Sequence, residues 1–146
     1  MQELPHQYRV AARADPGSDV ELSTDGVEPL TSAPPVQFGG PGDHWSPEDL
    51  LVAALADCFI LTFRAIATFK QLEWHSLACE ANGTLDRRDR KTQFTAFTIS
   101  AELEIPAGGD TGEAERLLHK AEERCLVTNS LVAGVTLEVR VRQRQA

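Results

Sequence analysis

The sequence predicts an α+β fold, on the evidence of two kinds of hydrophobic pattern and of their order. Stretches in which apolar and polar residues alternate, typical of strands, surround two stretches with the apolar spacing of helices. The order is strand, strand, a short third strand, helix, strand, strand, helix and strand, with no internal repeat. This order is typical of an α+β protein. Because 146 residues match the length of one domain, residues 1–146 are expected to form a single domain.

The first part of the chain predicts a hairpin followed by a loop. Residues 8–14 and 20–24 alternate on either side of the turn Asp15-Pro16-Gly17-Ser18. Residues 25–45 are rich in proline and glycine, and only Val36–Phe38 is expected to form a short strand there. The glycines of this segment lack the spacing and the Lys-Ser/Thr ending of a phosphate-binding loop.

A long helix is predicted from Ser46 to about Lys70. Ser46 is a helix-capping residue, Pro47 suits the first helical position, and Trp45 can pack on Leu50. Residues 50–63 are apolar almost all round the helix, a pattern typical of a buried helix. Since one sheet covers only one side of a helix, a second subunit is expected to cover the other.

The second part of the chain predicts a hairpin, a helix and a last strand. Residues 75–85 and 97–105 alternate on either side of a charged turn, and residues 135–142 alternate again. Asp110 and Glu113 have the spacing of a capping box. Cys125 continues the apolar stripe of this second helix, and residues 128–130 break it.

Composition and charge exclude several functions. A net charge of −8 disfavours binding to nucleic acid or to anionic lipid. No stretch of 18 uncharged apolar residues and no apolar leader is found, so we expect a cytoplasmic protein without a membrane span. The three separated cysteines do not form a disulfide scaffold. His75 and Cys79 share a strand face but belong to no paired metal motif, so no metal is expected.

The segments around Cys58 and Cys125, FGGPGDHWSPEDLLVAALADCF and AEERCLVTN, resemble two motifs of the OsmC/Ohr family of thiol peroxidases. Residues 38–59 resemble the central-helix motif of that family, and residues 121–129 resemble its second cysteine motif. The resemblance implies antiparallel sheets packed around two central helices in an intertwined homodimer. It implies that Cys58 is the peroxidatic cysteine, that Cys125 is the resolving cysteine, and that Glu48 is the supporting glutamate.

The resemblance also implies a reaction. Cys58 attacks a hydroperoxide, organic ones above all and hydrogen peroxide as a further candidate, and becomes a sulfenic acid that Cys125 converts to a disulfide. No cofactor is bound, and an external dithiol, with a lipoyl-type protein as one candidate, restores the thiols. The residues that the resemblance places at the substrate pocket are Gln37, Phe38, His44 and Phe59.

The sequence departs from the family pattern at the activating cation. The family places an arginine either in the first hairpin turn, where this chain has residues 15–18, or where it has Gln37. Arg9, Arg13 and His44 are the candidate replacements, and Leu126 stands where a proline is usual. Without a cation, we expect the Cys58 thiolate to be weakly activated. The alternative function is a family member without efficient peroxidase activity that binds a small apolar or thiol ligand.

Overall fold

The computed structural model describes residues 1–145 and divides into two compact units, one from Met1 to Leu51 and one from Val52 onward. The helix that begins at Pro47 continues from the first unit into the second. The two units are described separately below. That residues 1–146 form one domain stays a prediction.

The first unit is built on a small antiparallel sheet. Its strands β1 (Ala11–Arg13), β2 (Val20–Ser23) and β3 (Leu30–Ser32) are paired in sequence order. The predicted hairpin is confirmed, whereas β3 was not anticipated. The expected strand at Val36–Phe38 is wrong, because these residues form a 3-10 turn, η1. Pro35 starts this turn, and its carbonyl accepts a hydrogen bond from the Phe38 N–H at 2.9 Å.

The long helix α1 spans Pro47–Phe69, as predicted. The Ser46 hydroxyl accepts a hydrogen bond from the Asp49 N–H at 3.0 Å, which confirms the predicted cap. Five side chains of α1 are buried in the core: Leu55, Phe59, Phe63, Ile66 and Ala67. These five lie at helical spacing, so a single stripe of the helix packs against the rest of the second unit.

The second unit has one three-stranded sheet, in the order β4 (Ser76–Arg88), β5 (Lys91–Ile105) and β6 (Gly134–Gln143). β4 and β5 form an antiparallel hairpin, closed by Asp89 and Arg90 with φ of 51° and 68°. β6 pairs parallel to β5, so the expectation of purely antiparallel sheets is wrong. The helical connection between β5 and β6 carries the chain back to the starting end of β5, from where a strand can only run parallel to it.

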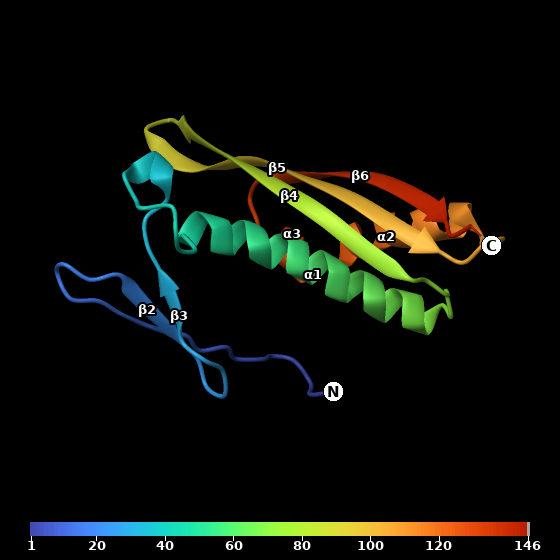
Figure 1. The fold of residues 1–146 in the computed structure, drawn as a ribbon, viewed down its shortest axis with the longest axis horizontal. Helices are drawn as coiled ribbons and strands as arrows, with labels where there is room; N and C mark the ends of the chain where they lie inside the picture. Colours follow the sequence, from blue (N-terminus) through green and yellow to red (C-terminus); the bar gives the residue numbers. More distant parts are fainter. Residues whose placement is uncertain (146) are drawn as a thin grey trace. The chain divides into compact units, whose positions relative to one another are not determined.

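That connection contains α2 (Thr111–Arg124) and the four-residue helix α3 (Leu126–Asn129), which was not anticipated. Asp110 caps α2 as predicted, since its carboxylate accepts a hydrogen bond from the Glu113 N–H at 3.0 Å. Leu117 and Leu118 of α2 are fully buried and share a core with α1 and with the apolar face of β5. The helices therefore cover one face of the sheet (Figure 1).

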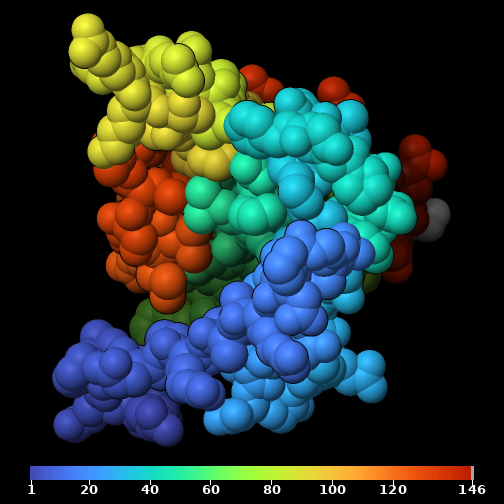
Figure 2. Space-filling view, turned by 90° about the vertical axis from the view of Figure 1, so that its left-hand side faces the viewer, coloured from blue at the N-terminus to red at the C-terminus, as the bar shows by residue number. Residues whose placement is uncertain are grey.

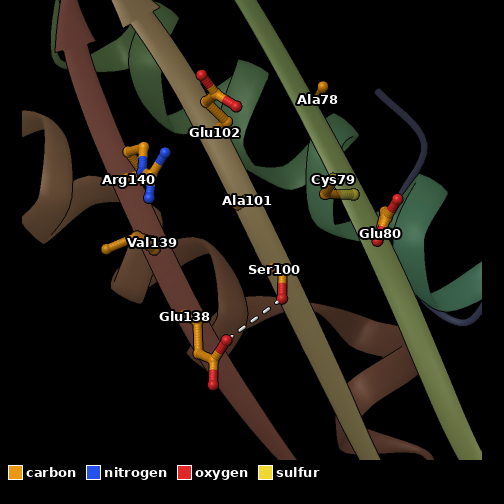
Figure 3. A pocket seen from close by; sticks show the side chains of 9 residues that line it. All are labelled: Ala78, Cys79, Glu80, Ser100, Ala101, Glu102, Glu138, Val139 and Arg140. Carbon is orange, nitrogen blue, oxygen red and sulfur yellow. Dashed lines mark hydrogen bonds between the residues drawn. The ribbon is translucent and has the colours of Figure 1, made fainter.

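The opposite face of the sheet is polar. A shallow hollow of about 530 Å³ lies on it, and Figure 3 shows the charged side chains that line it from all three strands. The Ser100 hydroxyl donates a hydrogen bond to Glu138 at 3.4 Å there. Glu80, Glu102 and Arg140 also lie in this hollow. The mixture of charges is typical of a solvated sheet face.

By length and composition alone, α1 could cross a membrane, which the sequence pattern did not indicate. Its mean hydropathy over 18 residues is 2.0, although Asp57 and Arg64 interrupt the apolar run. Core helices pass the same test, and α1 buries its stripe against the sheet. Only 22% of that window is fully buried within the described chain, and the side chains of Leu51, Leu61 and Phe69 on α1 are exposed.

Candidate active site at a pair of thiols

Cys58 lies in the middle of α1 and is partly buried. Its sulfur is 3.8 Å from the hydroxyl oxygen of Thr62, one helical turn further on, at the spacing that places two side chains on the same helix face. Apolar residues dominate the rest of the helix. Cys58 and Thr62 therefore form a small polar spot on a helix that is otherwise mostly apolar.

Cys125 lies at the junction of α2 and α3. It ends α2 and begins α3, because its extended backbone, with φ of −63° and ψ of 115°, interrupts the helical hydrogen bonding. Its side chain is fully buried in the core, on the inward side as the apolar stripe of α2 predicted. In the space-filling view, the orange surface of this junction region lies beside the green surface of α1 (Figure 2).

The structure makes the two thiols neighbours, since Cys58 and Cys125 each act on the pKa of the other. Burial raises the pKa of Cys125, and the neighbouring Cys58 raises it further, which outweighs the hydrogen bonds from Thr128. Of the two thiols, Cys125 is therefore the one that ionises less readily.

Cys58 has the opposite character. Burial raises its pKa, but hydrogen bonds from the Val127 N–H, the Cys125 thiol, the Thr62 hydroxyl and the Leu126 N–H together hold that pKa below its ordinary value. The pKa of Cys58 is thus lowered without a cation, and how strongly Cys58 is activated stays a prediction. Uncharged hydrogen-bond donors lower the pKa of Cys58, whereas the sequence led us to expect that a cation would be needed.

Two of those donors are backbone groups in the first turn of α3, which the sequence analysis missed. The N–H groups of a first helical turn have no partner within the helix, so they are free to bind a sulfur anion. Leu126 contributes one of them because it is not a proline, which has no N–H. The sequence did show Leu126 where the family usually has a proline. Without the fold, however, nothing indicated that the N–H of this residue lies near Cys58.

Glu48 lies in the first turn of α1, ten residues before Cys58. At 1.5 Å per residue, about 15 Å of helix separates the two positions, which is beyond the reach of a glutamate side chain. The carboxylate atom Oε1 of Glu48 is buried and has no hydrogen-bond partner among residues 1–145. A buried carboxylate oxygen without a partner is costly, so a partner outside this chain would stabilise it.

The four predicted pocket residues are divided between the two units, and that they line one pocket stays a prediction. Gln37 and Phe38 belong to η1, with the Phe38 side chain 61% exposed. The His44 ring is 3.3 Å from Asp19 and 3.7 Å from Asp43. In the second unit, Phe59 is fully buried in the core.

Cys79 is the third cysteine and lies apart from the pair. Its sulfur points from β4 to α1 and is 3.9 Å from the carbonyl oxygen of Ala56. Burial raises its pKa, so it is a poor nucleophile. Across residues 1–145, no group of three or more His, Cys, Asp or Glu side chains is arranged to hold a metal.

The fold and the site together define an α+β protein with a paired-cysteine site between its helices and without a preformed disulfide. The sequence profile of the OsmC-like proteins matches residues 40–140. The chain therefore belongs to the OsmC-like family, as the resemblance of its two motifs indicated.

Individual relatives agree with this family. The chain is 30% identical over 110 residues to the uncharacterized protein YmaD of Bacillus subtilis, covering 72% of each chain. It is 27% identical over 97 residues to the peroxiredoxin OsmC of Escherichia coli, covering 66% of this chain and 67% of that protein.

Solved structures share the fold. An OsmC-like protein of unknown function from Vibrio cholerae superposes with a TM-score of 0.85 at 19% identity, covering 93% of this chain and all of that one. An organic hydroperoxide resistance protein OsmC from Legionella pneumophila has a TM-score of 0.75 at 26% identity, covering 95% and 98%. The α+β fold with two sheets and three helices is thus an OsmC/Ohr fold.

Proposed function

We propose that this protein is a thiol peroxidase that reduces organic hydroperoxides, with hydrogen peroxide as a further substrate. The observation that carries the proposal is the pair of neighbouring thiols whose pKa values shift in opposite directions, lowered at Cys58 and raised at Cys125. A low pKa makes a thiolate available to attack, and a neighbouring thiol is available to resolve the product. Relatives named peroxiredoxin OsmC and organic hydroperoxide resistance protein support it.

The reaction balances with these two residues and an external dithiol. The Cys58 thiolate attacks one peroxide oxygen, the O–O bond breaks, and the alkoxide takes up a proton and leaves as the alcohol. Cys58 is then a sulfenic acid. The Cys125 sulfur attacks it, a disulfide forms and water leaves. The dithiol, for which a lipoyl-type protein is a candidate, reduces the disulfide by exchange, and no bound cofactor takes part.

The second part of the proposal is a homodimer in which Glu48 acts across the subunits. The uncovered apolar surface of α1 supports a second copy packed against it. With two α1 helices antiparallel, Glu48 of each chain would approach Cys58 of the other, and its buried unpartnered oxygen would gain a partner. We place this dimer in the cytoplasm, where reductants keep three free cysteines reduced.

One observation favours the second candidate function, a binding protein for a small apolar or thiol ligand. The two sequence positions at which the family carries its arginine hold Gln37 and the turn Asp15-Pro16-Gly17-Ser18. A site without that cation would hold its thiolate less firmly than the family pattern does.

The deciding experiment measures intact mass and free thiols after one equivalent of cumene hydroperoxide. We expect the loss of two thiols and two mass units, with peptide mapping placing the disulfide between Cys58 and Cys125 and leaving Cys79 free. Oxidation of Cys79 first would overturn the assignment of Cys58 as the reacting thiol, and three unchanged thiols after the peroxide has been added would favour the binding function.

A further inference from the structure

Thr128 belongs to the short helix α3 and lies three residues after Cys125. Its hydroxyl oxygen is buried and has no nitrogen or oxygen partner for a hydrogen bond among residues 1–145. A buried hydroxyl in this situation has given up its hydrogen bonds to water without replacing them, which costs free energy. The hydroxyl is therefore free to donate a hydrogen bond to another kind of acceptor in the site.

The sulfur of Cys125 is the acceptor on which Thr128 acts. Burial is the main cause that raises the pKa of Cys125, whereas the N–H and the hydroxyl of Thr128 lower that pKa. The two residues lie in one segment of the second unit, a single turn apart. Their proximity is thus set by α3 itself and does not depend on what packs against α1.

The strength of this interaction depends on the charge of the sulfur. A thiol sulfur is a weak acceptor, whereas a charged acceptor binds a hydroxyl about twice as strongly as a neutral one. Cys125 is fully buried, so water does not take over this role around its side chain. The hydroxyl of Thr128 therefore gains most when Cys125 loses its proton.

The threonines of α1 provide a comparison. Thr68 donates its hydroxyl to the carbonyl oxygen of Arg64 at 3.0 Å, as helical threonines often do. The hydroxyl oxygen of Thr62 lies 3.8 Å from the sulfur of Cys58. Each sulfur of the thiol pair thus has a threonine hydroxyl of its own, and the one at Cys125 has no nitrogen or oxygen partner within the described residues.

We propose that Thr128 is a positioning residue for the step in which Cys125 resolves the oxidised Cys58. This inference rests on the proposed function, because a resolving cysteine has to lose its proton at a buried position. In this step the Cys125 sulfur attacks the Cys58 sulfenic acid. The S–S bond forms as the S–O bond breaks, and the hydroxide leaves as water with the proton that Cys125 released. While the Cys125 sulfur is negative, the Thr128 hydroxyl donates a hydrogen bond to it.

The expected effect of losing this hydroxyl has two opposing parts. A hydrogen bond to a charged group changes the ratio of thiolate to thiol by about tenfold. Without it, less thiolate is present, but each thiolate is a better nucleophile, by about threefold for that change in ionisation. Resolution should therefore be about threefold slower where Cys125 is mostly a thiol and about threefold faster where it is fully ionised.

The assay uses dithiodipyridine, a small disulfide whose reaction releases coloured thiopyridone, in a Cys79→Ser background. The first release reports the attack of Cys58 on the reagent and leaves Cys58 as a mixed disulfide. The second release reports the attack of Cys125 on the Cys58 sulfur. Because no peroxide takes part, the resolving chemistry of Cys125 is measured whether or not the protein reduces peroxides.

The deciding variant is Thr128→Val, which keeps the branched shape and removes the hydroxyl. Plotted against pH, its second release should start below that of the unchanged protein and cross above it, while its first release should stay the same. Thr128→Ser, which retains a hydroxyl, should restore the original profile, and Thr128→Ala should behave like Thr128→Val. Stability to urea should not fall in Thr128→Val, since the missing hydroxyl had no nitrogen or oxygen partner.

Two further variants separate this role from a general disturbance of the site. The Ser130 hydroxyl donates a hydrogen bond to the carbonyl oxygen of Leu126 at 2.8 Å, so Ser130→Ala disturbs α3 without removing a group that acts on Cys125. It should leave both releases unchanged. Thr62→Val should slow the first release at low pH and leave the second unchanged, because its hydroxyl lies at Cys58.

The inference and the proposed function can fail separately. A second release in Thr128→Val that is unchanged, or slower at every pH without a crossing, would overturn the role of Thr128. The same change in Ser130→Ala would also overturn it. If the profiles cross but cumene hydroperoxide leaves the thiols of the unchanged protein intact, the role of Thr128 at Cys125 stands and the peroxidase function falls.

Discussion

Replacing Leu126 by proline tests whether backbone amides activate Cys58. The substitution removes one N–H donor to the Cys58 sulfur and changes little else. Leu126 is the first residue of α3, a position that proline favours, and the extended backbone of Cys125 suits the residue before a proline. The Leu126 side chain is 69% exposed, so its loss leaves no cavity.

The expected effect is moderate. A hydrogen bond to a charged group contributes about 1.5–3 kcal/mol. The Leu126 N–H makes the smallest contribution among the donors that lower the pKa of Cys58. Because Cys58 is only partly buried, solvent screening reduces the contribution of this hydrogen bond to about 1 kcal/mol. That is about a fivefold change in the ratio of thiolate to thiol. The pKa should rise, because a donor that favoured the anion is gone.

The assay is the rate of Cys58 alkylation by iodoacetamide as a function of pH, in a Cys79→Ser/Cys125→Ser background and again with Cys125 present. At pH values below the midpoint, Leu126→Pro should react about fivefold more slowly, while at high pH, where the thiol is fully ionised, the rates should converge. The matched control is Leu126→Ala, which keeps the N–H and should titrate like the unchanged protein. An unchanged midpoint in Leu126→Pro, or an equal shift in Leu126→Ala, would refute the role of the amide.

Three further predictions test the site and the fold. In Cys125→Ser, one equivalent of hydroperoxide should leave Cys58 as a sulfenic acid that dimedone traps and that excess peroxide over-oxidises; a folded variant without any adduct would exclude Cys58 as the nucleophile. Glu48→Ala and Cys58→Ser subunits, each inactive alone, should regain activity when unfolded and refolded together, because a mixed dimer holds one intact pair; inactive but verified mixed dimers would rule out action across the subunits. Asp110→Ala should lower the free energy of unfolding by about 1 kcal/mol in urea titrations, since the Glu113 N–H loses its acceptor, whereas Asp110→Asn should retain most of it.

Elements whose signals are local could be predicted from the sequence alone. Ser46 and Asp110 cap α1 and α2 as predicted, because a cap depends on residues within one turn of helix. The β4–β5 hairpin and the inward side of Cys125 followed from apolar periodicity in the same way. The two cysteine motifs were enough to indicate the family.

The local apolar pattern was not enough to tell a strand from a helical turn in segments of only three or four residues. Val36–Phe38 carries apolar residues suited to a strand, yet it forms a 3-10 turn, which begins after Pro35 and ends where Gly39 adopts a φ of 84° that glycine tolerates. The same limit hid α3, whose four residues give no helical period to detect.

The direction in which the pKa of Cys58 shifts could be seen only in the folded chain. The parallel pairing of β6 with β5 depends on the path of the connection that contains α2 and α3, which no strand pattern records. The chain's return along that path brings Cys125 and the free amides of α3 to a thiol far away in sequence. A pKa depends on every donor and charge around a group in space, so the residues next to Cys58 in the chain could not predict its direction.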